Sequence, residues 1–363
     1  MSKNPVSSAK IGAILLAIAS LSLLLVACGG DTTDANAPEV RLQGAGATFP
    51  NPLYQKWFSE YNKITPNAKF DYQSKGSGFG ITQIKAKTVD FAGSDAPMKD
   101  DDLKAAPAPI LHIPTVLGGV VIIYNVPEIT GELKLTPEAV SGIFMGTIKK
   151  WNDPAIASSN SGVNLPAKDI TVVHRSDSSG TSFIFTDYLS KVSPEWKDKV
   201  GANTSVQWPV GVGAGGSEGV TGQVKQTPYS VSYVDLIYAL QNKLGYATLK
   251  NAAGEFVKPS LDSVSAAAAS ASGQIPDDLR VSITNAPGKD SYPISSFTYI
   301  LVYKDQPDEA KGKALVKFLW WATHAGEEFA PGLAYAKLPA DVVTKDEQKI
   351  NSITFQGKPL HTS

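Results

Sequence analysis

The chain has 363 residues, of which 42% are hydrophobic and 18% are charged, and its formal net charge is −1. This length favours two domains over one, and this composition predicts a packed core rather than a disordered chain. A net charge so close to zero excludes a global field that would draw the protein to nucleic acid or to an anionic membrane. We therefore expect no nucleic-acid partner, and any bound anion must be held by local chemistry.

The N-terminal residues 1–27 are typical of a secretory signal rather than of a membrane-spanning helix. Lys3 and Lys10 precede an apolar run over residues 11–26, and Ala27 comes directly before Cys28. A short apolar run with a basic start and small residues at its end marks a signal peptide. The segment resembles a bacterial lipobox, which implies cleavage before Cys28 and lipidation of this residue.

Cys28 is the single cysteine of the chain, which excludes a disulfide framework and a thiolate metal site. A buried or incidental thiol is the weaker interpretation, because Cys28 ends an apolar run. Lipid chains on Cys28 would hold the mature protein at a bacterial membrane, on the cell surface or in the periplasm, with its domains in water. The small polar residues of 28–39 predict a flexible tether between the lipid and the fold.

Strand-like and helix-like patterns alternate after the tether, which predicts an α/β fold with sheets covered by helices. Leu53, Trp57 and Tyr61 lie on one helical face, and Thr136 precedes a helix with proline in its first turn. The alanine-rich stretch 263–273 predicts a surface helix. Apolar strand-like runs occur at residues 40–42, 70–72, 116–124, 170–174, 245–249 and 297–303.

Three segments place glycine and hydroxyl residues immediately before a helical pattern, at residues 44–50, 76–80 and 175–182. The start of a helix offers free backbone N–H groups and the positive end of its dipole, and glycine lets an anion come close. Each segment is thus a candidate anion cradle. Serine and threonine at helix starts are more often plain caps. The repetition of the pattern, and the presence of Arg175 in one segment, favour a binding site.

The same segments carry a resemblance to the phosphate-binding proteins of bacterial high-affinity phosphate ABC importers. The motifs are Gly-Ala-Gly-Ala-Thr-Phe-Pro at 44–50, Gly-Ser-Gly at 76–78, Val-Asp-Phe-Ala-Gly-Ser-Asp-Ala-Pro at 89–97 and Arg-Ser-Asp-Ser-Ser-Gly-Thr-Ser-Phe at 175–183. They fall in the order that this family shows, and they span most of the mature chain.

This resemblance implies an α/β fold of the class II periplasmic-binding-protein type, with a ligand cleft between two lobes. The chain would cross between the lobes near residues 114–118 and near residues 285–293. The first lobe would comprise residues 40–115 and 290–363, and the second lobe residues 116–289.

The resemblance also implies a set of phosphate contacts. Asp177 would pair with Arg175 and orient it. Two positions depart from the family pattern, since Phe79 follows Gly78 and Ser178 stands where glycine is common, although neither change removes a predicted donor. The implied ligand contacts are Thr48, Phe49, Ser77, Asp95, Arg175, Ser179, Gly180 and Thr181.

Asp95 is the one acidic side chain in this implied contact set. A carboxylate beside an anion is repulsive unless the ligand supplies a proton, and inorganic phosphate near neutral pH still carries an O–H group. Sulfate has no such proton and would leave the acceptor unpaired. From the residues alone, a turn or cap role for Asp95 remains an equal interpretation. The resemblance decides for ligand binding.

Two further motif matches overlap at residues 211–216 (G-x-G-x-x-G) and 215–219 (G-x-S-x-G). The first lacks the preceding strand that a dinucleotide site needs, and the second lacks a suitably placed histidine partner. We interpret this stretch as a loop before a helix that begins near Val220. The lone histidines have no metal-ligand spacing, so the sequence predicts neither a metal nor a cofactor.

The leading function class is a monomeric binding protein without catalysis, which captures inorganic phosphate and delivers it to the permease subunits of an ABC importer. The alternative is a secreted phosphatase with Ser77 or Ser179 as nucleophile. A third class is an adhesin or signalling lipoprotein in which phosphate binding is secondary.

Overall fold

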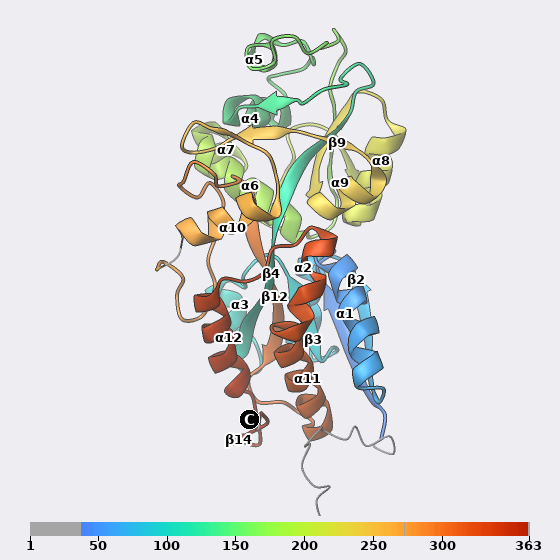
Figure 1. Cartoon of the computed structure of the whole chain (residues 1–363), viewed down its shortest axis with the longest axis vertical. Helices are drawn as coiled ribbons and strands as arrows, with labels where there is room; N and C mark the ends of the chain where they lie inside the picture. The colour runs from blue at the N-terminus through green and yellow to red at the C-terminus, as the bar shows by residue number, and fades with distance from the viewer. Residues whose placement is uncertain (1–37, 272, 362–363) are drawn as a thin grey trace, which may run out of the picture. The chain divides into compact units, whose positions relative to one another are not determined.

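The computed structural model describes residues 38–271 and 273–361, so the predicted signal segment and Cys28 lie outside the described residues. In the described part, the main sheet has nine strands in the order β2-β1-β3-β12-β4-β8-β6-β7, with β9 also paired to β4. We call the elements before β4 and from β12 onward the first lobe, and those between β4 and β12 the second lobe. Figure 1 shows the two groups on either side of β4.

The first lobe contains the N-terminal and C-terminal segments of the described chain. Its elements are β1 (Val40–Gly46), α1 (Asn51–Ile64), β2 (Ala68–Ser74), α2 (Ser77–Lys85), β3 (Phe91–Ser94), α3 (Asp100–Lys104), β12 (Ser295–Tyr303), α11 (Glu309–Ala322), the 3-10 helices η1 (Ala325–Phe329) and η2 (Pro331–Leu333), α12 (Ala340–Asn351), β13 (Thr354–Phe355) and β14 (Lys358–Pro359).

The second lobe is formed by the middle of the chain. Its elements are β5 (Lys134–Leu135), α4 (Pro137–Met145), α5 (Pro154–Ala157), β6 (Thr171–Arg175), α6 (Gly180–Val192), α7 (Pro194–Lys199), β7 (Val212–Ala214), α8 (Gly216–Gln226), β8 (Ser230–Asp235), α9 (Leu236–Asn242), β9 (Gly245–Tyr246), β10 (Thr248–Lys250), β11 (Phe256–Val257) and α10 (Leu261–Ser270).

The strand β4 (Ile110–Asn125) belongs to both lobes. Its residues as far as Gly119 pair antiparallel with β12, and its residues from Val120 onward pair antiparallel with β8. One continuous strand therefore changes its partner between Gly119 and Val120 (Figure 1). The predicted α/β fold of two lobes is confirmed.

Parallel pairing on each side of β4 brings strand ends together. In the first lobe, β1 lies between β2 and β3, and it runs parallel to both. In the second lobe, β6 lies between β8 and β7, again in parallel. Helices in the connections of each lobe cover the sheet and start where the strands end, which is the arrangement that places ligand sites beyond the carboxyl ends of strands.

Aromatic side chains fill the core of each lobe. The ring centroids of Phe70 and Phe318 lie 4.5 Å apart in the first lobe, and those of Phe185 and Tyr233 lie 4.4 Å apart in the second. Trp57 is fully buried, and its indole Nε1 donates to the Gly326 carbonyl over 2.7 Å. These rings remove large apolar surfaces from water and so fix the helices on the sheet.

The alanine-rich stretch forms the helix α10, which has exposed positions on one face and buries the other face, including Val264, as surface helices do. The structure corrects two other expectations about local structure. The helix α8 begins at Gly216 instead of near Val220, and the short strand β7 precedes it. Likewise α2 begins at Ser77, ahead of the helical pattern seen in the sequence. Glycine lowers helix propensity in the first turns of α2 and α8, but tertiary packing outweighs that preference.

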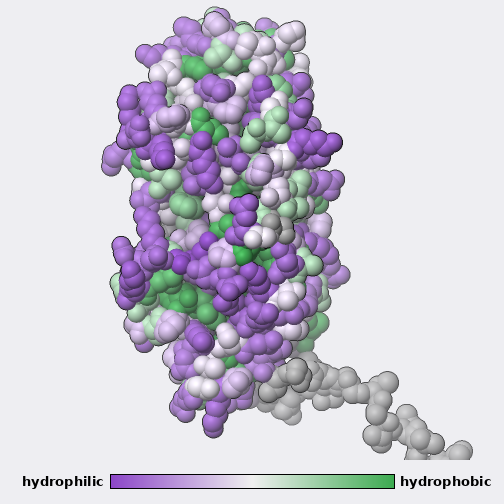
Figure 2. Space-filling model, turned by 90° about the vertical axis from the view of Figure 1, so that its left-hand side faces the viewer, coloured by the Kyte–Doolittle hydropathy of each residue, from purple (hydrophilic) through white to green (hydrophobic). Residues whose placement is uncertain are grey.

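The surface view in Figure 2 shows a face on which hydrophilic residues surround smaller hydrophobic areas. Within the described residues, no helix is long and apolar enough to cross a membrane.

Candidate functional site

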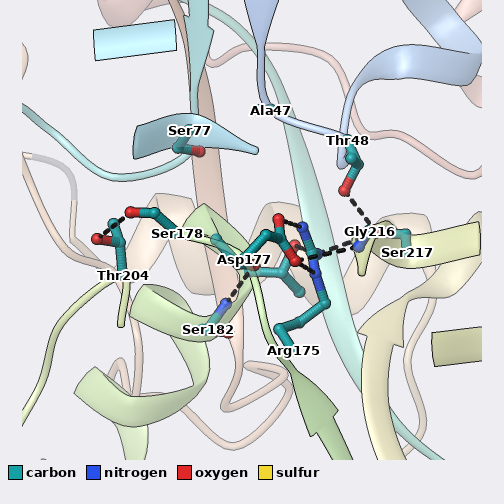
Figure 3. Close-up of polar contacts among 12 residues, drawn as sticks. Ala47, Thr48, Ser77, Arg175, Asp177, Ser178, Ser182, Thr204, Gly216 and Ser217 are labelled. Carbon is teal, nitrogen blue, oxygen red and sulfur yellow. Dashed lines mark hydrogen bonds and ion pairs between the residues drawn. The ribbon is translucent and has the colours of Figure 1, made fainter. Parts of the chain in front are cut away.

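Polar residues follow the carboxyl ends of four strands of the main sheet. Thr48 lies just beyond β1, Asp95 directly follows β3, Arg175 ends β6 and Asp235 ends β8. The side chains of all four residues are buried. Thr48 and Asp95 belong to the first lobe and the other two to the second, so the site lies where the lobes meet. Figure 3 shows Thr48 and Arg175 with their polar neighbours.

Arg175 is the central cation of the site. Its side chain is 1% exposed. Its Nε donates a hydrogen bond to Asp177 Oδ1 over 2.7 Å, and its Nη2 donates to Asp177 Oδ2 over 2.5 Å. This bidentate pair fixes the plane of the guanidinium and leaves Nη1 directed at Thr181 Oγ1 and Ser217 Oγ, each 3.4 Å away (Figure 3). Burial opposes ionisation of Asp177, but the hydrogen bond and charge of Arg175 hold its pKa below the usual value.

The helix α6 begins beside Arg175 with Ser179 as its N-cap. The Ser179 hydroxyl accepts from Ser182 N over 3.0 Å, so the capping role that the sequence left open is present. Capping uses an oxygen lone pair and leaves the hydroxyl proton of Ser179 available. The N–H groups of Gly180 and Thr181 lie in the first helical turn, where no intrahelical acceptor exists. This segment therefore presents donors only.

Asp95 lies on the opposite side of the site. Its Oδ1 accepts from Thr298 Oγ1 over 2.7 Å, and its Oδ2 lies 3.4 Å from Ser77 Oγ. The turn after β3 is closed by Ser94, whose hydroxyl donates to the Ala96 carbonyl. The hydrogen bonds of the Asp95 carboxyl are thus with Thr298 and Ser77, and the bond across the turn is made by Ser94.

Burial is the main influence on the Asp95 carboxyl. It raises the pKa of Asp95 to about 7, although hydrogen bonds from Thr298 and Ser77 and the charge of Arg175 lower it. Asp95 is therefore an acceptor whose charge depends on pH near neutrality.

Glycines lie at two close contacts between the lobes. Gly78 N donates to the Ser178 carbonyl over 2.9 Å. A Cβ atom on Gly180 would overlap Ser77 Oγ and lie 2.5 Å from Asp95 Oδ2, and a Cβ atom on Gly78 would overlap the Ser178 side chain. Glycine at 78 therefore leaves room for Ser178, which is one of the two departures from the family pattern.

The structure adds Ser217, Asp235 and Thr298 to the site, and sequence reasoning missed all three. Ser217 Oγ lies 2.8 Å from Thr48 Oγ1 and 3.1 Å from Asp235 Oδ2. Ser217 follows Gly215 and Gly216 at the start of α8, which is a fourth example of the glycine and hydroxyl pattern used to find the other segments. Asp235 and Thr298 had no comparable local signal.

Phe49 lies beside Thr48 with its ring fully buried and 5.9 Å, centroid to centroid, from the ring of Tyr335. The structure thus brings every ligand-contact residue expected from the sequence to one buried region. Among the described residues, no group of three or more histidine, cysteine or acidic side chains is placed to hold a metal.

Two lobes that enclose a buried set of donors and one directed carboxyl define a binding protein for a small anion. Residues 31–323 match a family model described as a PBP superfamily domain. The chain is 50% identical over 305 residues to the phosphate-binding protein PstS of Pasteurella multocida, which covers 84% of this chain and 88% of the relative. It is 47% identical over 306 residues to PstS of Haemophilus influenzae, a match that covers 84% of this chain and 90% of the relative.

Solved structures share the fold. A phosphate-binding protein from Stenotrophomonas maltophilia aligns with TM-score 0.65 and 20% identity, over 86% of this chain and 94% of that chain. A putative phosphate ABC transporter substrate-binding protein from Clostridium perfringens aligns with TM-score 0.61 and 15% identity, over 83% of this chain and 100% of that chain. Together with the sequence relatives, these matches mean that the chain belongs to the PstS family of phosphate-binding proteins in the PBP superfamily.

The raised pKa of Asp95 predicts a pH-dependent stability. Between about pH 4 and about pH 7 the folded protein holds a proton on Asp95 that the unfolded chain has released, so stability falls as pH rises through this window. Asp95→Asn cannot take part in this titration. The difference between its free energy of unfolding and that of the wild type should therefore increase with pH, by up to about 1.4 kcal/mol per pH unit. Urea unfolding at several pH values, without added anions, measures the difference.

The exposed Asp101 provides the matched control, because its side chain is 98% exposed. Asp101→Asn should follow the pH dependence of the wild type. Parallel stability curves for Asp95→Asn and wild type would show that Asp95 is ionised throughout this range.

Proposed function

We propose that this protein binds inorganic phosphate outside the cytoplasm and delivers it to an ABC importer. The observation that carries the proposal is one buried carboxyl, Asp95, facing a set of donors arranged around Arg175. The sequence relatives named above are phosphate-binding proteins, and a structural neighbour from Vibrio cholerae is an ABC-type phosphate transport receptor. Isothermal titration of the purified protein with phosphate is the direct test.

The proposed contacts with phosphate come from both lobes. Donors at the start of α6 and from Arg175 would bind ionised oxygens, and Asp95 would accept the remaining ligand O–H. Asp177 would act by holding Arg175. The proposed set is Thr48, Phe49, Ser77, Asp95, Arg175, Ser179, Gly180 and Thr181.

Binding without catalysis is supported over a phosphatase. Ser179 Oγ caps α6, and Ser77 Oγ contacts Asp95. In the described chain, neither serine is hydrogen-bonded to a histidine, and an activated serine needs a base oriented by a third group. The relatives carry binding-protein names. Incubation with p-nitrophenyl phosphate should give no turnover.

The finer organisation of the chain is also part of the proposal. We propose lobes of residues 40–115 with 290–363 and of residues 116–289, joined near 114–118 and 285–293. A ligand that contacts both lobes stabilises the closed form, because an open form offers only half the contacts. The protein would act as a monomer that docks on permease subunits.

Asp95→Asn should change anion selectivity. An amide oxygen still accepts from the phosphate O–H, so phosphate binding should persist. Sulfate binding should improve relative to phosphate, because the amide N–H₂ can donate to it and the carboxylate charge is gone. An unpaired buried acceptor costs about 1–3 kcal/mol, which corresponds to about 10- to 100-fold in the affinity ratio. Paired titrations with the two anions measure this ratio.

Arg175→Ala is the comparison variant for selectivity, because it should lower the affinities for phosphate and for sulfate by similar factors. An unchanged phosphate-to-sulfate ratio in Asp95→Asn would remove Asp95 from the selectivity mechanism.

Gly180→Ala should oppose lobe closure, because the added Cβ would collide with Ser77 and Asp95. We expect phosphate affinity to fall at least about tenfold, since closed-state contacts are lost or strained. Gly222→Ala in α8 is the matched control, because a Cβ there meets nothing within 4 Å. Titration compares the two variants, and small-angle scattering should show compaction by phosphate in the control only. Equal affinity in both variants would mean that the lobes do not close on Gly180.

We further propose that the mature chain begins at lipidated Cys28 and is anchored to a membrane. Support comes from the apolar run before Cys28 and the small residues around it. Cys28→Ser should release or misprocess the protein in cells, while the purified domain still binds phosphate. Fractionation of membranes and a phosphate titration measure the two effects. Membrane retention of Cys28→Ser at the wild-type level would contradict the lipid anchor.

A further inference from the structure

Asp235 is a buried carboxyl for which the proposed contacts assign no role. It ends β8 beside the point where β4 changes lobes, since it pairs with Val120. Its side chain is 1% exposed. Its Oδ2 lies 3.1 Å from Ser217 Oγ, whereas its Oδ1 is buried and has no hydrogen-bond partner among the described residues.

Asp235 is linked to a proposed phosphate contact by two short steps, which we call the hydroxyl chain: Asp235, Ser217 and Thr48. Ser217 Oγ lies 2.8 Å from Thr48 Oγ1, and either oxygen can be the donor. The hydroxyl chain therefore crosses from the second lobe to the first (Figure 3). Arg175 Nη1 also donates to Ser217 Oγ, over 3.4 Å.

The direction of the hydroxyl chain depends on the proton of Asp235. An ionised Asp235 can only accept, so Ser217 O–H donates to Asp235 and Thr48 O–H donates to Ser217. Thr48 then presents only lone pairs to an anion. With a neutral Asp235 the chain can run the other way: Asp235 O–H donates to Ser217, Ser217 O–H donates to Thr48, and Thr48 O–H is free for the ligand.

We propose that Asp235 is a positioning residue for phosphate, which in its neutral acid form directs the hydroxyl chain so that Thr48 Oγ1 donates to a ligand oxygen. This inference rests on the proposed function and deepens it. Asp95 and Asp235 then have opposite roles in hydrogen bonding. Asp95 accepts a hydrogen bond from the O–H group of the ligand, whereas Asp235 donates the first hydrogen bond of the hydroxyl chain, which ends at the ligand.

The surroundings of Asp235 favour the neutral acid. The charged and titratable groups that influence it or are influenced by it are Asp95 directly after β3, Arg175 on β6, Tyr238 on α9 and Tyr335 beyond η2. Burial raises the pKa of Asp235 well above its usual value, the charge of Asp95 adds to this, and Arg175 opposes it. Burial also raises the pKa of both tyrosines, which therefore remain neutral.

The experiment compares Asp235→Ala, Asp235→Asn and Ser217→Ala with the wild type by phosphate and sulfate titration. Loss of one directed hydrogen bond should lower the affinity for phosphate about tenfold in Asp235→Ala and in Ser217→Ala. Asp235→Asn should restore most of this loss, since an amide N–H donates as the neutral acid does. The affinity for sulfate should fall by the same factor as the affinity for phosphate. The phosphate-to-sulfate affinity ratio should therefore stay constant, whereas Asp95→Asn should change it.

The pH profile separates this role from a structural one. Asp235→Asn cannot ionise, so its affinity relative to the wild type should rise once the pH exceeds the raised pKa of Asp235 and the wild type loses the proton. Asp346→Asn is the matched control, because Asp346 is a fully buried carboxyl of α12 whose two oxygens have no partner in the described residues. Its affinity should equal that of the wild type at each pH.

Infrared spectroscopy reads the proton directly. The ligand-free wild type should show a protonated-carboxyl band with a component that Asp235→Asn lacks, beside the contributions of Asp95 and Asp346 that both proteins share. This reading is possible even if Asp235→Ala fails to fold. The inference is overturned if this band is the same in both proteins, or if Ser217→Ala and wild type bind phosphate equally. Wild type that binds no phosphate overturns the proposed function as well. Wild type that binds phosphate with the same affinity as Asp235→Ala and Ser217→Ala overturns the hydroxyl chain alone.

Discussion

The bidentate pair of Arg175 and Asp177 is the contact on which the rest of the site depends. A buried guanidinium is costly without a partner, and both carboxylate oxygens of Asp177 are used to hold it. Asp177 Oδ1 also accepts from Gly216 N over 3.0 Å, which fixes the start of α8 next to β6. Ser217 is therefore placed by the same carboxylate that orients Arg175, so the cation and the hydroxyl chain share one support.

The shared strand β4 explains how a rigid site can still open. Each lobe positions its own residues on its own half of the sheet, and the halves are continuous only through β4. Rotation about the change of partner between Gly119 and Val120 would separate Thr48 from Ser217 and Gly78 from Ser178 without disturbing Arg175 and Asp177. The buried ion pair thus lies within one lobe. The contacts between the lobes at the site are hydrogen bonds such as those of Thr48 with Ser217 and of Gly78 with Ser178. The ion pairs between the lobes, of Arg280 with Asp100 and of Lys345 with Asp277, involve exposed carboxylates, and exposed pairs contribute little stability.

Local patterns were sufficient for those parts of the site that lie on one short segment. The glycine and hydroxyl segments, and Arg175 at a strand end, could be predicted because strand, turn and helix start follow each other directly. Thr298 could not be predicted, because its bond to Asp95 joins positions 203 residues apart. Asp235 was missed because no glycine, serine or threonine directly follows it at the end of β8, although its partner Ser217 is only 18 residues away. Ser217 was overlooked although its signal was present, because an enzyme motif match at the same residues drew attention to histidine partners.

A charge count shows why protons matter in this site. The charged groups around the site include one buried cation, Arg175, two buried carboxyls, Asp95 and Asp235, and the partly exposed Asp177. With every carboxyl ionised, the region would carry an excess of negative charge before any anion entered it, and Arg175 is already paired with Asp177. An anion can then enter only if the other two carboxyls are neutralised or are met by a ligand proton. In the proposed complex, phosphate would bring such a proton to Asp95, and the raised pKa of Asp235 would favour its neutral form.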